Sequence, residues 1–202
     1  MNSMFNSVKK LVRFDVNNFD TSNVQDFGNL FLSCHKMYSI DVSNFVTSKA
    51  KDMAWMFRDC LVLTTLDLSN FDTSLVTSMY GMFSFDKKLS SLNLSGFKTG
   101  RVVYFAFIFE SCNSLTSIDV SHLDVSSAKH FMGMFQTNPN LQVVNLTNFR
   151  TVQAYNFEKF FSDCSGLHTI ITWNILILME LLIRLICLKI ANLLLLWIYL
   201  IL

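Results

Sequence analysis

The stretch LTTLDLSNFDTSLVTSMYGMF, residues 63–83, contains most of the information that decides the fold. Its last residue, Phe83, belongs to a series of phenylalanines spaced 26 residues apart along the chain. The series consists of Phe5, Phe31, Phe57, Phe83, Phe109, Phe135 and Phe161. A period of about 20–50 residues is typical of solenoids, in which each repeat buries its apolar side only against its neighbours.

The first half of the repeat has the pattern of a strand followed by a turn. Leu66 and Leu68 alternate with polar residues, which predicts a short strand with one buried face. The sequence NFDTS at residues 70–74 predicts a turn, because Asn, Asp and Ser side chains form hydrogen bonds with the nearby backbone.

The second half of the repeat predicts a helix. Its apolar residues recur at steps of three and four, which is the spacing of one or two helical turns, and they are Val76, Met79, Met82 and Phe83. Thr77 or Ser78 would cap this helix. We therefore expect an α/β solenoid of about six to seven repeats of 26 residues, like a leucine-rich-repeat protein, with short parallel strands on one side and short helices on the other. The strands are expected at residues 14–16, 40–42, 66–68, 92–94, 118–120 and 144–146, and the helices before Phe31 and each later phenylalanine of the series.

The stretch 63–83 resembles the 26-residue repeat of BspA-like bacterial surface proteins, a leucine-rich-repeat family. The resemblance covers residues 1–170. It implies a surface-exposed role in adhesion or host interaction, and it supplies no catalytic residue. Asp86 and Asn138 depart from the pattern, because the other repeats have cysteine there, and we expect looser packing at these two places.

Four cysteines share one position of the repeat, three residues after the phenylalanine: Cys34, Cys60, Cys112 and Cys164. We interpret them as small buried apolar side chains. A disulfide would need Cα atoms within about 7 Å, which we do not expect at a position that follows the helix. The chain has no C-x-x-C pair of the kind that binds zinc. We expect no metal and no cofactor.

Charge and motifs argue against two classes of function. The net charge of +1 gives no electrostatic basis for binding nucleic acid. The chain has no nucleophile elbow, phosphate-binding loop or metalloprotease helix. Its four histidines occupy unrelated positions of the repeat. The sequence therefore does not predict an enzyme.

The strand contributes a polar stripe that we expect to point outward from the sheet, because successive side chains of a strand alternate between its faces. One interpretation is a ligand-binding surface that recognises a protein or a glycan. The other is a polar surface on a structural spacer with no ligand of its own. The candidate residues are Asp41, Asp67, Asn93, Asp119 and Asn145 and, two positions later, Ser43, Ser69, Ser95 and Ser121.

The two ends of the chain depart from a complete solenoid. No secretory signal precedes the first repeat. Residues 171–202 are an apolar tail, and a membrane anchor is one interpretation of it, although Glu180, Arg184 and Lys189 interrupt the run. We favour a shifted reading frame, because the codons of residues 190–202, when the last base of each is joined to the first two bases of the next, permit CKSLTSLDLSNF, which is another repeat. The chain would then be a fragment of a protein at the cell surface or outside the cell, and it would contact a membrane only if the tail is genuine.

Overall fold

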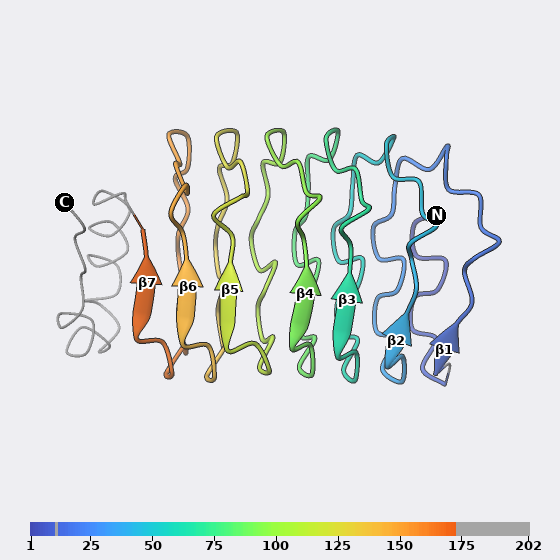
Figure 1. The fold of residues 1–202 in the computed structure, drawn as a ribbon, viewed down its shortest axis with the longest axis horizontal. Helices are drawn as coiled ribbons and strands as arrows, with labels where there is room; N and C mark the ends of the chain where they lie inside the picture. The colour runs from blue at the N-terminus through green and yellow to red at the C-terminus, as the bar shows by residue number, and fades with distance from the viewer. Residues whose placement is uncertain (11, 173–202) are drawn as a thin grey trace.

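The computed structural model describes residues 1–10 and 12–172. Within them lie seven short parallel strands, which Figure 1 shows side by side in chain order. They are β1 (Arg13–Phe14), β2 (Ser39–Ile40), β3 (Thr65–Asp67), β4 (Ser91–Asn93), β5 (Ser117–Asp119), β6 (Val143–Asn145) and β7 (Thr169–Ile171). Each repeat contributes one strand, so the molecule is a solenoid.

The register of the strands follows the sequence period. Thr65 pairs with Ser91, and Ser117 pairs with Val143, so paired residues lie one repeat apart. The strands lie where the alternation of leucines predicts them, but each begins one residue earlier and none exceeds three residues. The hydrogen-bonded ladders join β1 to β2, β3 to β4, and β5 to β6 to β7.

The predicted helices are wrong. None of the described residues is helical, and the segments before the phenylalanines are successive tight turns instead. In residues 27–34, the N–H groups of Leu30, Leu32 and Cys34 donate to carbonyls three residues back at 3.2 Å. The intervening N–H groups donate to the next repeat: Phe27 to the carbonyl of Asp52, Asn29 to Ala54, Phe31 to Met56 and Ser33 to Arg58, at 2.8–2.9 Å. We call this second set of inter-repeat bonds the turn ladder.

Left-handed residues explain why the turns do not continue as a helix. Asn29 and Ser33 have φ angles of 56° and 58°, and two equivalent residues recur in the later repeats. A right-handed helix has no place for such a residue, and its internal hydrogen bonds would leave no N–H for the next repeat. Apolar spacing alone cannot separate the two conformations, because the turns also bury positions 27, 30, 31 and 34 together.

Between the strands and the turn ladder lies a core of stacked phenylalanines. The rings of Phe31 and Phe57 are 5.5 Å apart between centroids, and those of Phe83 and Phe109 are 5.8 Å apart, both nearly parallel. The stacking runs without a break from Phe5 to Phe161. Each fully buried phenylalanine contributes about 1.5–3 kcal/mol of apolar burial, so this column contributes much of the stability.

Most of the predicted tail is not described by the structure, which ends its description at Thr172. Of the predicted tail, Ile171 lies in β7 and pairs with Asn145. The rest of the tail, residues 173–202, on which both the anchor and the frameshift interpretations depend, lies outside the described residues. In the part that is described, the structure contains no helix long and apolar enough to cross a membrane.

Lys159 tests the turn conformation, because it is exposed and has a φ angle of 58°. We expect Lys159→Gly to raise the free energy of unfolding by about 1 kcal/mol relative to Lys159→Ala, since a left-handed conformation costs L residues roughly 1–2 kcal/mol. In a helix the same comparison would favour alanine by about 1 kcal/mol. Urea unfolding of the two variants measures the difference, and a more stable alanine variant would contradict the turn assignment.

Candidate functional site

A groove interrupts the strand face between β4 and β5. No backbone hydrogen bond joins these two strands. No Cα of one lies within 8 Å of a Cα of the other, whereas paired strands are about 5 Å apart. The groove has a volume of about 580 Å³. Figure 1 shows the wider spacing at this place.

The groove is closed behind and at both ends. Behind it the turn ladder is intact, because Phe83 N–H donates to Ile108 carbonyl at 3.0 Å. At one end the Ser114 hydroxyl donates to the carbonyl of Lys87 at 2.9 Å. At the other end the His122 Nε2 lies 3.1 Å from the carbonyl of Leu94. The opening therefore faces outward between two side-chain bridges.

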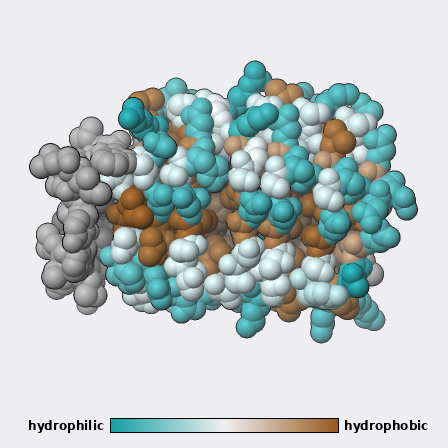
Figure 2. Space-filling view, in the orientation of Figure 1, coloured by the Kyte–Doolittle hydropathy of each residue, from teal (hydrophilic) through white to brown (hydrophobic). Residues whose placement is uncertain are grey.

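Its lining is polar at the rim and apolar at the floor. Leu92 and Ile118, the inward residues of β4 and β5, are only half-buried, whereas Leu66 on β3 and Val144 on β6, with which they pair away from the groove, are buried. Figure 2 shows that the whole face has a similar distribution, with hydrophobic (brown) surface along its middle between mostly hydrophilic (teal) and neutral (white) surface. The polar residues of the rim are Ser90, Ser91, Asn93, Ser95, Ser117, Asp119, Ser121 and His122.

Gly96 distinguishes the loop after β4 from the equivalent loops of the two preceding repeats. Asn44 and Asn70 stand at this position in earlier repeats, and their side chains donate to carbonyls of the preceding repeat. Gly96 has no side chain, and its backbone lies so close to the preceding repeat that an added Cβ would be 2.0 Å from the Ser69 carbonyl oxygen. The loop after β4 therefore lies in close backbone contact with the loop after β3.

The structure places the predicted polar stripe on the exposed strand face and gives most of it a local bond. Asp67 Oδ1 accepts from the N–H of Ser69 at 2.9 Å, and Asp119 accepts from Ser121 at 2.8 Å. Asp41, Asn93 and Asn145 form the same bond with the residue two positions later, which is Ser43, Ser95 or Thr147. These side chains stabilise the turn after each strand. The groove brings together four members of the stripe: Asn93, Ser95, Asp119 and Ser121.

The aspartates of the stripe, Asp41, Asp67 and Asp119, have lowered pKa values and are kept ionised. The N–H and hydroxyl of Ser69 lower the pKa of Asp67. Partial burial opposes ionisation of Asp119, but hydrogen bonds from Ser121 outweigh it, and the pKa of Asp119 is lowered. A ligand in the groove therefore meets a carboxylate. Ser95 and Ser121 were among the predicted residues, whereas Ser90, Ser91, Ser117 and His122 were not, because nothing within one repeat distinguishes β4 and β5 from the other strands.

The four cysteines are buried and form no disulfide, as the sequence predicts. Each thiol donates to the carbonyl of the phenylalanine 29 residues earlier, as Cys60 does to Phe31 at 3.3 Å and Cys112 to Phe83 at 3.1 Å. Burial raises the pKa of the Cys34 and Cys164 thiols to about 11. These thiols are consequently protonated structural donors rather than nucleophiles.

Asp86 and Asn138 replace two of these thiols and are as buried as the cysteines. Asn138 Nδ2 donates to the carbonyl of Phe109 at 2.8 Å, in the manner of a cysteine. Asp86 Oδ1 accepts from the Cys60 N–H at 2.8 Å, while its Oδ2 has no hydrogen-bond partner. Burial raises the pKa of Asp86 well above its ordinary value. The departure from the pattern thus changes hydrogen bonding rather than exposing the site.

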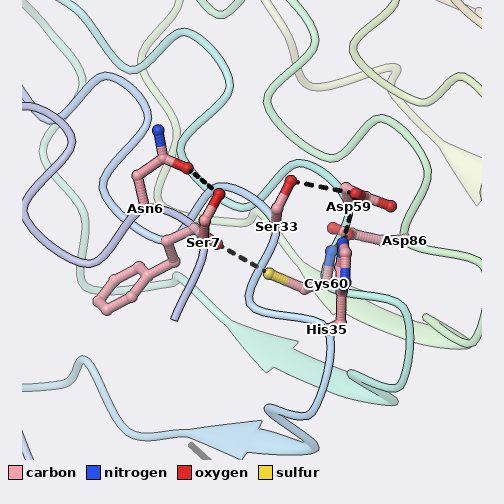
Figure 3. A network of polar contacts seen from close by, with 8 residues as sticks. Asn6, Ser7, Ser33, His35, Asp59, Cys60 and Asp86 are labelled. Carbon is pink, nitrogen blue, oxygen red and sulfur yellow. Dashed lines mark hydrogen bonds and ion pairs between the residues drawn. The ribbon is translucent and has the colours of Figure 1, made fainter. Parts of the chain in front are cut away.

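A polar cluster beside this column contains serine, histidine and aspartate, and Figure 3 shows its arrangement. Asp59 Oδ2 lies 2.7 Å from His35 Nε2 and accepts from the Ser33 hydroxyl at 3.1 Å. The serine is bonded to the carboxylate and not to the imidazole, so the histidine does not activate it as a base would. The described residues also include no group of three or more His, Cys, Asp or Glu side chains that could hold a metal ion.

Comparison with known proteins identifies the repeats. The model of a family described as "Mycoplasma protein of unknown function, DUF285" matches residues 1–84 and 62–174. The chain is also similar to the crystal structure of a leucine-rich repeat protein from Bacteroides ovatus, with 15% identity and a TM-score of 0.32. That match covers 85% of this chain and 58% of the other, and a TM-score of this size does not establish a shared fold. A search of curated proteins gives no match.

Asp86 makes the stability depend on pH. Because its pKa is raised in the folded state, the native protein binds the proton more tightly than the unfolded chain, and stability falls as the pH rises from about 4 toward the folded pKa. We expect Asp86→Asn to remove this decline and to raise the free energy of unfolding at pH 7 by about 1–3 kcal/mol, because an amide at this position carries no charge and, as Asn138 does, can donate to the carbonyl of the phenylalanine 29 residues earlier. The matched variant Asn138→Asp should introduce the decline. Urea unfolding between pH 4 and 8 measures both, and an unchanged pH profile in Asp86→Asn would contradict a neutral buried carboxyl.

Proposed function

Because the chain belongs to the DUF285 family, whose function is unknown, its role must be inferred from its surface, and we propose that its strand face binds a protein or glycan ligand. The parent protein would be an adhesion or host-interaction protein at the cell surface or outside the cell. The sequence resemblance to BspA-like surface proteins supports this location. No enzymatic step and no nucleic acid enter the proposal.

The groove between β4 and β5 is the observation that carries the proposal. A volume of about 580 Å³ lies within the usual range of roughly 300–1,000 Å³ for ligand sites. Its apolar floor, formed by Leu92 and Ile118, provides burial for a ligand. Its rim offers hydroxyl, amide, carboxylate and imidazole groups, which fix the orientation of a ligand through hydrogen bonds.

The alternative is a structural spacer without a ligand, and the Asx-type turns favour it. Asp41 and Asp67 lie outside the groove, and each bonds to the second residue after it. A structural need for these turns explains the regular stripe without any ligand. The stripe as a whole is therefore weaker support for binding than the groove, where the repeat symmetry is broken.

Blocking the groove distinguishes the two functions. We expect Ser117→Trp to lower ligand affinity by at least about tenfold, since the exposed Ser117 lies on the rim and an indole would fill the opening. Thr65→Trp is the matched control, because Thr65 is the exposed equivalent residue on β3, where the ladder to β4 is intact.

The measurement is the binding of the labelled full chain to a glycan array and to a peptide library. Loss of signal in Ser117→Trp but not in Thr65→Trp supports a binding module. Absence of any specific signal would leave the spacer as the function, whereas an equal signal in both variants would place the ligand outside the groove and contradict the proposed site.

A further inference from the structure

We propose that the groove accepts an extended peptide, which inserts between β4 and β5 as an additional strand and pairs with both. This rests on the proposed function and names its ligand class. Two strands separated by one intervening strand are about 9.5 Å apart, twice the usual spacing. All Cα atoms of β4 lie more than 8 Å from those of β5, which is well beyond the spacing of about 4.8 Å for adjacent strands and approaches that of two strands flanking a third.

The backbone groups that would pair with the peptide already face the groove. On β4, the N–H of Ser91 and the carbonyl of Asn93 are used toward β3. On β5, the carbonyl of Thr116 and the N–H of Val120 are used toward β6. In a parallel ladder, alternate residues point to opposite sides. Leu92 on β4, and Ser117 and Asp119 on β5, therefore direct their backbone groups into the groove.

These groups make a backbone ligand more suitable than any other. A peptide strand presents N–H and C=O groups at a fixed spacing on both edges, and the groove presents the complementary groups on both of its sides. Inserting a strand would pair these groups with a backbone partner, and it would also cover the half-buried Leu92 and Ile118. The peptide should accordingly have apolar residues at alternate positions that point toward the floor.

The dimensions of the groove limit the peptide to a short segment. The bridge from Ser114 to Lys87 bounds one end, and the bridge from His122 to Leu94 bounds the other. Behind the groove the turn ladder is unbroken, because the Gly81 N–H donates to the Ala106 carbonyl and the Phe85 N–H donates to the Glu110 carbonyl. The peptide therefore cannot pass through the core. The groove thus takes a single strand from the outer face.

A synthetic peptide with the sequence of residues 64–70, TTLDLSN, is a suitable probe, because it is already a strand of this repeat. We expect it to bind the full chain saturably in fluorescence anisotropy. Its binding should slow amide hydrogen exchange at Leu92, Leu94, Ser117 and Asp119. Ser117→Trp should lower the affinity at least about tenfold, and Thr65→Trp should leave it within about twofold.

A peptide of the same sequence, N-methylated at two alternate residues, is the matched control for backbone pairing. It keeps every side chain but loses amide donors along one edge, so it should bind at least about tenfold more weakly. Equal binding of the methylated and unmethylated peptides would overturn strand insertion. Protection confined to the amides of β1 or β7 would also overturn it, because the peptide would then lie on an end of the array.

The glycan array separates this inference from the function on which it rests. If the peptide fails to bind while glycans bind in a manner that Ser117→Trp abolishes, strand insertion is wrong and the binding function stands. If neither peptides nor glycans bind, both are wrong. If the peptide binds as described, both are supported.

Discussion

The structure depends on one constraint, which is that the backbone of each repeat is satisfied by the repeats before and after it. Two sets of inter-repeat bonds enforce this, the short parallel strands and the turn ladder. Both sets join residues close to one sequence period apart. Everything else in the repeat must therefore recur at that spacing, and the stacked phenylalanines and buried thiols do so because the backbone places them above one another.

Within the described residues, the two sets of inter-repeat bonds differ in continuity. The turn ladder continues past every described repeat, whereas the strand ladder is interrupted at β4–β5 and β2–β3. At β2–β3 some Cα atoms still lie within 8 Å, and at β4–β5 none do. The repeats are thus separated on the strand side at β4–β5 while they remain joined on the other side, so a groove forms without loss of the core.

The sequence predicts the strands well and the opposite side badly. Leu66 and Leu68 around Asp67 have an alternation that only a strand explains, whereas the spacing of Phe27, Leu30, Phe31 and Cys34 suits a helix and a series of turns equally. The left-handed residues that decide between them are varied in type and give no signal. The outward position of the stripe was predictable, but the groove was not, because it arises from contacts between repeats.

The turn ladder has a consequence for how such a chain changes in evolution. An insertion or deletion of one residue within residues 27–34 would reverse the alternation of N–H groups, so the groups that now donate to the next repeat would point away from it. The bonds of that repeat with the repeats before and after it would both be disturbed. Gain or loss of a complete repeat leaves every bond partner equivalent. Recombination between homologous repeats is therefore the tolerated route of change, and related chains should differ in length by whole repeats.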